Sequence, residues 1–458
     1  MPTDFKTLPL GPAMLSNLES MGYATMTPIQ VASLPVVLSG QDVIAQAKTG
    51  SGKTAVFGIG LLTKIDAQKF SVQALVLCPT RELADQVAKE IRRLARCMPN
   101  IKVLTLCGGT PIGPQYGSLE HGAHIVVGTP GRVKKHLDQA TLKLENVTTL
   151  VLDEADRMLD MGFYDAITEI IAQAPSRRQT LLFSATYPAA IKELSRRFQN
   201  SAVDIKVEAM HDAVQIEQLF YETTPSQKQA LLTALLAHYR PDSAVVFCNT
   251  KIQCQHVADA LVSAGFSALA LHGDMEQKER DRVLVLFANK SNPILVATDV
   301  AARGLDVKDL QAVISFDLAF EAETHIHRIG RNGRAGKAGL ALSLVTPSDA
   351  QRMIAIEEYQ QTSLVYGDAG ALLKNLNQEA PPQMITLCID GGRKDKVRPG
   401  DILGALTGEA GIASEHVGKI DIFDNHAYVA IAQSMAHKAL KRLAEGKIKG
   451  RKFKVRKL

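Results

Sequence analysis

The chain lacks the features that mark a membrane or secreted protein. No apolar run reaches the ~18 residues that a membrane-spanning helix needs, and the beginning MPTDFKTLPL has no basic stretch followed by an apolar one. The six cysteines form no CxxC pair, and several lie inside apolar, strand-like runs. We therefore expect a cytoplasmic protein with free thiols, without disulfides, a zinc site or a membrane attachment.

A length of 458 residues is too great for one core, since domains of ~100–200 residues predict two to four of them. Short apolar runs alternate with helical patterns from about residue 43 to 345, which is typical of parallel sheets covered by helices. Two runs recur at nearly one offset: residues 74–80 (ALVLCPT) return as 244–250 (AVVFCNT), and 125–129 (IVVGT) as 294–298 (ILVAT). The sequence predicts two copies of one α/β domain, at 1–207 and 216–365, joined by a linker at 208–215.

A third domain follows a second predicted linker at 366–382. Residues 383–458 show the order strand, helix, strand, strand, helix, strand (βαββαβ), which is typical of RNA-recognition modules. Residues 380–458 contain 15 Lys or Arg against 8 Asp or Glu, whereas the net charge of the whole chain is only +5. The positive excess therefore lies in this small α+β domain, as a phosphate-binding surface requires.

The glycine-rich segment after the strand-like run 43–47 has the pattern of a phosphate-binding loop. Glycines let backbone N–H groups wrap phosphates, and the helix that follows adds its N-terminal dipole. Lys53 can reach the β and γ oxygens, and Thr54 can hold Mg²⁺. The predicted nucleotide contacts of this loop are Ala47, Lys48, Thr49, Gly50, Ser51, Gly52, Lys53 and Thr54.

An acidic motif, DEAD at residues 153–156, follows another apolar run. Paired acids after a buried strand suit a Mg²⁺ ligand, Asp153, and a carboxylate that orients the attacking water, Glu154. The second copy has no GKT, so we do not expect it to hold a nucleotide of its own.

With these motifs, residues 5–345 resemble the DEAD-box RNA helicases, which are named after the motif at 153–156. The resemblance implies two tandem RecA-like domains, ATP and Mg²⁺ as cofactors, and RNA-stimulated ATP hydrolysis coupled to local unwinding of RNA duplexes. It identifies an adenine-reading segment, in which Gln30 meets the adenine edge, Phe5 packs on the base and Tyr23 lies beside it. It also places Asp306 at the ribose.

The same resemblance assigns roles to residues of both copies. Arg331 and Arg334 are similar to arginine fingers, which complete a catalytic set of Lys53, Asp153 and Glu154. The residues implied to couple the ATP state to domain closure are Asp156, Ser184, Thr186, Arg303, His327 and Arg328. The implied contacts to the RNA backbone are Arg81, Gly108, Gly109, Thr129, Gly131, Arg132, Gln277, Arg280 and Thr298.

Residues 384–458 resemble the RNA-binding domain of the bacterial DbpA-type helicases, which implies targeting to large-subunit (23S) ribosomal RNA in assembling 50S particles. RNA-recognition modules stack bases on sheet aromatics, but the expected strand has one aromatic residue, Tyr428. Basic residues are therefore the predicted contacts to structured RNA: Arg393, Lys394, Lys396, Arg398, Lys447, Lys449, Arg451 and Lys452.

Three alternatives share many of these motifs. An ATP-gated RNA clamp would have no net unwinding activity, a DNA translocase would use the same core, and the third domain could bind a protein. The DEAD motif and the RNA-type third domain favour an RNA helicase, which we expect to be a monomer.

Overall fold

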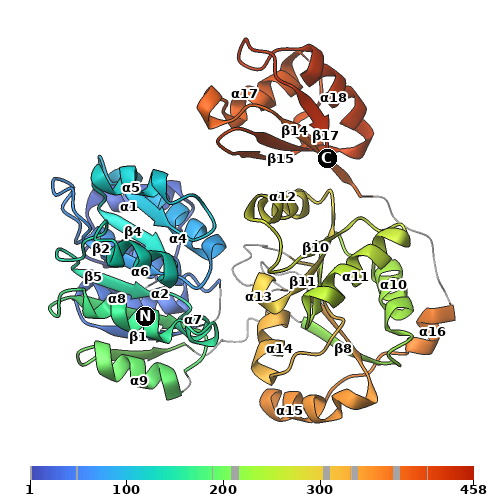
Figure 1. Ribbon diagram of the computed structural model, residues 1–458, viewed down its shortest axis with the longest axis horizontal. Helices are drawn as coiled ribbons and strands as arrows, with labels where there is room; N and C mark the ends of the chain where they lie inside the picture. The colour runs from blue at the N-terminus through green and yellow to red at the C-terminus, as the bar shows by residue number, and fades with distance from the viewer. Residues whose placement is uncertain are drawn as a thin grey trace. The chain divides into compact units, whose positions relative to one another are not determined.

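The computed structural model describes residues 3–47, 50–187, 189–207, 216–302, 310–330, 332, 339–374, 382–409 and 411–458. The chain divides into two compact units, of which the first ends at Asp212 and the second holds nearly all later residues (Figure 1). The predicted linker 208–215 lies outside the described residues. Among the helices of the described ranges, none is long and apolar enough to cross a membrane.

The first unit is built on a parallel sheet in the order β3-β4-β2-β5-β6-β1-β7. Most of these strands are fully buried, as their near-continuous apolar runs predict, because helices cover both faces of the sheet. The strands are β1 (Val43–Gln46), β2 (Ala74–Leu77), β3 (Val103–Leu106), β4 (Ile125–Gly128), β5 (Thr149–Leu152), β6 (Gln179–Ser184) and β7 (Val203–Lys206). The helices are α1 (Pro12–Ser20), α2 (Pro28–Leu38), α3 (Lys53–Leu62), α4 (Arg81–Leu94), α5 (Gly113–Glu120), α6 (Pro130–Asp138), α7 (Ala155–Asp160), α8 (Tyr164–Ala172) and α9 (Ala189–Phe198).

The second unit begins with another parallel sheet, in the order β10-β11-β9-β12-β13-β8. Except for the edge strand β7, this order repeats that of the first sheet, so the predicted duplication is confirmed. The strands are β8 (Ile216–Glu222), β9 (Ala244–Cys248), β10 (Ala268–Leu271), β11 (Ile294–Thr298), β12 (Ala312–Ser315) and β13 (Gly339–Val345). The helices are α10 (Lys228–Tyr239), α11 (Lys251–Ser263), α12 (Gln277–Ala288), α13 (Asp299–Ala302), α14 (Ala322–Ile329) and α15 (Ala350–Gln360).

The stretch 366–382, predicted as a linker, is partly a helix, α16 (Ala369–Lys374). Asp368 begins it by accepting a hydrogen bond from the backbone N–H of Ala371, at 3.0 Å. Leu372 and Leu373 pack against the core of the second domain. The second domain therefore continues past residue 365, and the linker is shorter than predicted.

The third domain has an antiparallel sheet in the order β15-β16-β14-β17. Its elements are β14 (Met384–Ile389), α17 (Pro399–Gly404), β15 (Val417–Ile422), β16 (Ala427–Ala432), α18 (Ala436–Glu445) and β17 (Val455–Lys457). This confirms the predicted βαββαβ order. The domain has a hydrophobic core of its own, built from alternate residues of the strands and the inner faces of both helices.

Candidate nucleotide and RNA sites

The loop between β1 and α3 contains two glycines that the backbone requires. Gly50 and Gly52 have φ angles of 82° and 99°, in the left-handed region that glycine adopts at little cost. A Cβ atom on Gly52 would lie 2.5 Å from Nε2 of Gln30. A larger residue at Gly52 would therefore both strain the loop and displace Gln30.

Lys53 is the first residue of α3, and its ammonium group points back over the loop. The side chain is buried, and Nζ donates to the carbonyl oxygen of Ala47 at 2.6 Å. Thr54 follows it in the first turn of the helix, where hydroxyl and backbone N–H groups lie at the carboxyl end of the sheet. Lys48 and Thr49, predicted to contact nucleotide, lie outside the described residues.

The segment that begins α2 is hydrogen-bonded to the phosphate-binding loop. The backbone N–H of Thr27 donates to Oε1 of Gln30 at 2.9 Å, and the Thr27 hydroxyl donates to the carbonyl of Ser51 at 2.8 Å. Nε2 of Gln30 donates to the carbonyl of Gly52 at 3.2 Å. The predicted adenine-reading residue thus lies directly against the loop and is held rigidly there.

Two aromatic residues predicted near the base lie together in the first domain. The rings of Phe5 and Tyr23 meet edge to face, with centroids 5.9 Å apart, and Phe5 is buried. The Tyr23 hydroxyl donates to Oε1 of Glu90 at 2.8 Å, and burial, with this bond, raises the pKa of Tyr23. Phe5 therefore lies within the core of the first domain, and the half-buried ring of Tyr23 packs against that core.

The acidic motif lies directly after β5. Asp153 and Glu154 are both buried, and burial raises the pKa of Asp153 to about 7, an effect that nearby Lys53 partly offsets. Glu154 has a φ of 50°, which is unusual for a residue with a side chain and typical of strained positions at functional sites. A buried carboxylate beside a lysine is suited to bind a cation, because a positive charge there would favour its ionised form.

The last acid of the motif connects β5 to the end of β6. Oδ2 of Asp156 accepts hydrogen bonds from the backbone N–H groups of Ala185 and Thr186, at 3.2 and 3.0 Å, and from the Thr186 hydroxyl at 3.0 Å. The Ser184 hydroxyl accepts from the Asp156 N–H at 3.3 Å. Two segments predicted to act in coupling are therefore joined within the first domain.

Among the predicted RNA contacts of the first domain, Arg81 and Gly109 are in close contact. Gly109 has a φ of 69°, and a Cβ there would overlap the Arg81 guanidinium. Arg81 begins α4, whereas Gly108 and Gly109 follow β3. The glycine is thus needed so that the guanidinium can lie flat on the loop.

Arg132 is held by a partly buried hydrogen-bond network that the sequence did not predict. Its NH1 donates to Oε1 of Gln115 at 2.9 Å, and its NH2 donates to the carbonyl of Thr110 at 3.0 Å. The same Gln115 oxygen lies 2.9 Å from Nε2 of buried His136, whose Nδ1 lies 2.9 Å from the Thr141 hydroxyl. In the sequence, only His136, one helical turn after Arg132, could have indicated this network. Gln115, which joins the two side chains, is distant in sequence.

Thr129 and Gly131 stand at the start of α6, beside Arg132. Thr129 is the residue before the helix, with an extended backbone, and Pro130 occupies the first helical position. Among the described residues, apart from its chain neighbours and the backbone of its own helix, no heavy atom lies within 4 Å of a Cβ built on Gly131.

In the second domain, Arg328 is almost fully buried and joins several strand ends. Nε and NH2 donate to the carboxylate of Asp299, both at 2.7 Å. NH2 also donates to Oδ1 of Asn249 at 2.9 Å, and NH1 donates to the carbonyl of Asp317. The guanidinium therefore organises the carboxyl ends of the second sheet from inside the domain.

The other predicted residues of the second domain are less enclosed. Thr298 ends β11, and Gln277 begins α12, where its Nε2 donates to Asp281 at 2.8 Å. NH1 of Arg280 donates to the carbonyl of His272 at 3.3 Å. Four predicted residues lie outside the described residues: Arg303, Asp306, Arg331 and Arg334.

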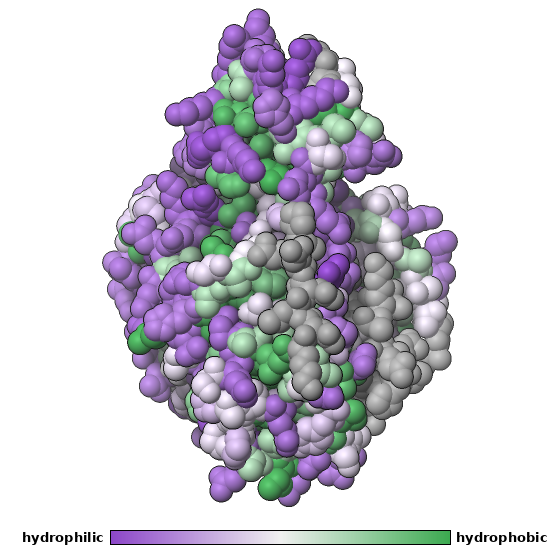
Figure 2. All heavy atoms as spheres, turned by 90° about the vertical axis from the view of Figure 1, so that its right-hand side faces the viewer, coloured by the Kyte–Doolittle hydropathy of each residue, from purple (hydrophilic) through white to green (hydrophobic). Residues whose placement is uncertain are grey.

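The basic residues of the third domain form two exposed stretches that the fold brings together. Lys449 Nζ donates to the carbonyl of Lys396 at 3.0 Å, which joins the turn before β17 to the loop after β14. The third domain lies at the top of Figure 2, where hydrophilic side chains predominate. We call the following residues the basic surface: Arg393, Lys394, Lys396, Arg398, Lys447, Lys449, Arg451 and Lys452.

The third sheet offers few rings on which bases could stack. Tyr428 lies on β16, and Phe423 packs against it edge to face, with centroids 5.5 Å apart. Thr386 and Cys388 of β14 are buried and carry no ring. RNA contact through the basic surface stays a prediction of the sequence, and the sheet adds one ring pair, Phe423 with Tyr428.

The arrangement of these groups defines a class of protein. The two parallel sheets share their strand order except for the edge strand β7, and the first has a phosphate-binding loop and an acidic motif at its carboxyl edge. This combination is typical of enzymes that hydrolyse nucleoside triphosphates. Comparison with family models is specific: residues 27–194 match the DEAD/DEAH box helicase, 227–336 the helicase conserved C-terminal domain and 386–457 the DbpA RNA binding domain.

Relatives cover nearly the whole chain. It is 56% identical over 455 residues, 99% of either chain, to the ATP-dependent RNA helicase DbpA of Escherichia coli strain K12. It is 43% identical to the DEAD-box ATP-dependent RNA helicase CshA of Bacillus subtilis, over 78% of this chain and 72% of that one. The structure of Saccharomyces cerevisiae Dbp5 bound to RNA and ADP BeF3 matches with a TM-score of 0.74 at 29% identity, covering 82% of this chain and all of that one.

The chain belongs to the DEAD-box ATP-dependent RNA helicases. It is an ATP-hydrolysing enzyme that binds RNA and carries a DbpA-type RNA-binding domain.

Proposed function

We propose that this helicase acts on large-subunit (23S) ribosomal RNA during assembly of the 50S subunit, and that its third domain selects this RNA. The observation that carries the proposal is the basic surface on a domain that matches the DbpA RNA-binding type. Its exposed cations can contact phosphates of a folded RNA without reading bases, so RNA shape decides which site is bound.

The nucleotide site of this proposal uses the carboxyl edge of the first sheet. Gln30 meets the adenine edge, Phe5 and Tyr23 lie beside the base, and Asp306 meets the ribose. The phosphates lie on the loop that ends in Lys53, whose ammonium group can exchange the carbonyl of Ala47 for phosphate oxygens.

Mg²⁺ fits the donor set of this site. Hydroxyl and carboxylate oxygens are the ligands that the ion prefers, and Thr54 and Asp153 would hold it, partly through water. When bound, the ion supplies positive charge to the β and γ oxygens. Its presence would also keep Asp153 ionised, in spite of the burial that raises the pKa of this carboxyl.

Hydrolysis requires a water molecule aligned with the γ-phosphate. Glu154 orients it, and its fixed left-handed backbone limits the positions that the carboxylate can adopt. Arg331 and Arg334 stabilise the charge that develops on the transferred phosphoryl group, as arginine fingers do.

Coupling to RNA uses polar residues of both domains, among them Asp156 and Arg328, whose side chains are held by hydrogen bonds. Asp156 with Ser184 and Thr186 serves in the first domain, and Arg303, His327 and Arg328 serve in the second. RNA phosphates and 2′-hydroxyls are contacted by a set of polar and glycine residues from both domains: Arg81, Gly108, Gly109, Thr129, Gly131, Arg132, Gln277, Arg280 and Thr298.

Crosslinking of the protein to cellular RNA in a cytoplasmic extract tests this proposal. We expect 23S RNA in immature large-subunit particles to be enriched, with the enzyme bound as a monomer. A strand-displacement assay on a duplex beside that RNA distinguishes an unwinding enzyme from an ATP-gated clamp. Crosslinks spread over unrelated RNA would contradict the proposed target.

A further inference from the structure

The second sheet repeats the elements that form the nucleotide site of the first. Lys228 is the first residue of α10, which follows β8, just as Lys53 is the first residue of α3, which follows β1. Asp317 follows the end of β12 by two residues, and Glu154 follows the end of the equivalent strand β5 by two. A lysine and an acid thus recur at equivalent places in a domain to which no nucleotide is assigned.

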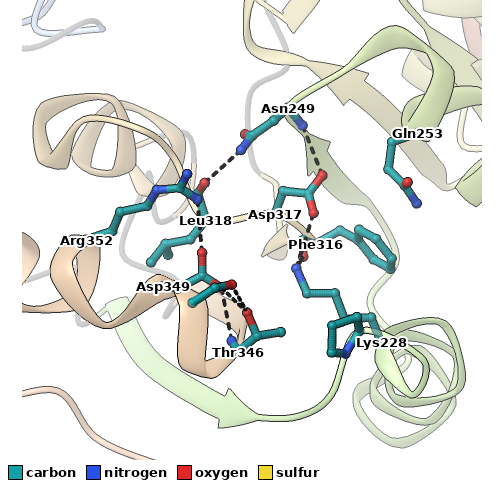
Figure 3. Close-up of a pocket in the computed structure, with 11 residues that line it drawn as sticks. Lys228, Asn249, Gln253, Phe316, Asp317, Leu318, Thr346, Asp349 and Arg352 are labelled. Carbon is teal, nitrogen blue, oxygen red and sulfur yellow. Dashed lines mark hydrogen bonds and ion pairs between the residues drawn. The ribbon is translucent and has the colours of Figure 1, made fainter.

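These groups line a pocket of about 330 Å³ in the second domain (Figure 3). Its walls come from the ends of three parallel strands, from the start of α10 and from α15. Lys228 and Arg352 approach it from opposite sides. The lining residues that the argument uses are Lys228, Gln253, Phe316, Asp317, Asp349 and Arg352.

On the α10 side, the carbonyl oxygen of Phe316 and both carboxylate oxygens of Asp317 each accept a hydrogen bond from the protein. Lys228 Nζ donates to the carbonyl of Phe316 at 2.7 Å and to Oδ1 of Asp317 at 3.2 Å. Oδ2 of Asp317 accepts from the backbone N–H of Asn249, also at 3.2 Å. An ammonium group has three N–H donors, so one of those on Lys228 remains for a ligand.

On the α15 side, both carboxylate oxygens of Asp349 also accept hydrogen bonds from the protein. Oδ2 of Asp349 accepts from the N–H and the hydroxyl of Thr346, at 3.0 and 2.8 Å, and Oδ1 accepts from NH1 of Arg352 at 2.9 Å. The Arg352 guanidinium lies 4.6 Å from the ring of Phe320, which holds its plane in place. It makes no further hydrogen bond with the described residues, so most of its five N–H donors remain.

We propose that this pocket binds the phosphate group of a small phosphorylated molecule, at a site separate from the ATP site. The formal charges of the two cations and two carboxylates balance, but each carboxylate oxygen already accepts a hydrogen bond from the protein, while both cations keep free donors. Gln253 adds an amide whose side chain has no partner among the described residues. Such a pocket favours a ligand whose oxygens only accept, and phosphate has several.

ATP in its usual binding mode does not fit this pocket. Residues 223–227 (TTPSQ), between β8 and α10, include no glycine, whereas backbone N–H groups wrap a triphosphate only on a glycine-rich loop. The proposed ligand is therefore held by side chains, at the phosphate group alone.

Equilibrium dialysis of the full chain with labelled pyrophosphate, without RNA, tests the proposal. We expect two bound equivalents. Lys53→Ala should remove one of them, and Lys228→Gln or Arg352→Gln should weaken the other about tenfold or more, since each removes a charge-assisted hydrogen bond. Glutamine keeps a donor toward Phe316 or Asp349, so the fold and the RNA-stimulated ATPase activity should persist.

The matched control is Lys251→Gln, which changes an exposed lysine at the first position of the neighbouring helix α11. It should bind two equivalents. The proposal is overturned if Lys53→Ala abolishes all binding, or if Lys228→Gln and Arg352→Gln both retain two equivalents. In the Lys53→Ala variant, the pyrophosphate bound in the second domain should remain bound when a short RNA is added. Its displacement by RNA would contradict a small-molecule ligand for this pocket.

Discussion

Glu154 and Lys53 lie near the same phosphates but contribute to different steps. Lys53 is part of the loop that binds ATP, whereas Glu154 acts on water and has a left-handed backbone that fixes its carboxylate. Binding and hydrolysis should therefore be separable by single substitutions, which is a direct test of the proposed roles.

We predict that Glu154→Gln retains ATP and RNA binding while hydrolysis falls by at least ~10²-fold, in the range typical of lost acid–base catalysis. Lys53→Ala should instead lose ATP binding. Fluorescent-nucleotide titration with single-turnover hydrolysis gives both quantities. Equal loss of ATP binding in the two variants would show that the roles are wrongly assigned.

Gln115 has a positioning role that can be measured. Its side-chain oxygen accepts from Arg132, so Gln115→Leu leaves that arginine with its bond to Thr110 and removes a partner of His136. We predict an increase of about threefold to tenfold in the RNA concentration for half-maximal ATPase stimulation, from the loss of a hydrogen bond worth ~1 kcal/mol. The maximal rate should change little.

The control for this experiment is Gln139→Leu, the same substitution at an exposed glutamine that bonds Tyr116 instead. It should leave RNA stimulation unchanged. If both variants behave alike, Arg132 does not depend on Gln115.

At the scale of elements, α6 depends on a histidine that must stay neutral. Burial lowers the pKa of His136 below its usual value of 6.5, and Arg132 and Lys135 act in the same direction. As the pH falls through about 6.5, the unfolded chain takes up a proton that the folded domain does not, so the free energy of unfolding decreases. The contribution of neutral His136 to the free energy of unfolding is therefore retained above this pH and decreases below it.

We predict that His136→Gln reduces the acid sensitivity of the chain, because glutamine has no proton to gain. Urea unfolding at pH 7.5 and pH 5.5, followed by circular dichroism, measures this. The difference between the two pH values should be smaller in the variant than in the original chain. An unchanged difference would remove His136 as a source of the acid sensitivity.

The elements show what the sequence could predict. Strands such as β2 and β9 are buried on both faces, so their apolar runs and their repetition are visible in the sequence. Helix α16 was missed because it is short, and it packs on the core of the second domain through Leu372 and Leu373. The motifs indicated the nucleotide site, but the network around Gln115 joins residues 17 and 21 positions away, which no local pattern reveals.

At the scale of the whole molecule, we propose that the first two domains hydrolyse ATP and that the third domain selects the RNA. Deleting the third domain tests this separation of roles. Removing residues 382–458 deletes the third sheet with its own core and the whole basic surface. The remaining chain should fold and hydrolyse ATP with nonspecific RNA. In salt titrations, the log–log slope of RNA binding should decrease by about 0.7 on single strands, or 0.9 on duplex, for each RNA phosphate that the third domain binds in the intact chain.

A charge-reversal variant distinguishes the basic surface from the sheet face. Reversal at Lys447, Lys449, Arg451 and Lys452 should weaken binding of a ribosomal RNA fragment strongly, whereas Tyr428→Ala should weaken it less, because few other rings are available for stacking. Binding titrations of both variants make the comparison. A larger effect of Tyr428→Ala would indicate recognition by the sheet.

The most direct test of the central claim is the ratio of ATPase stimulation by a 23S RNA fragment to that by an unrelated RNA of equal length, measured for the intact chain and for the chain without residues 382–458. We predict a high ratio for the intact chain and a ratio near one for the shortened chain, with similar rates on the unrelated RNA. An equally high ratio in both would contradict the targeting role of the third domain and favour a protein-binding role for it.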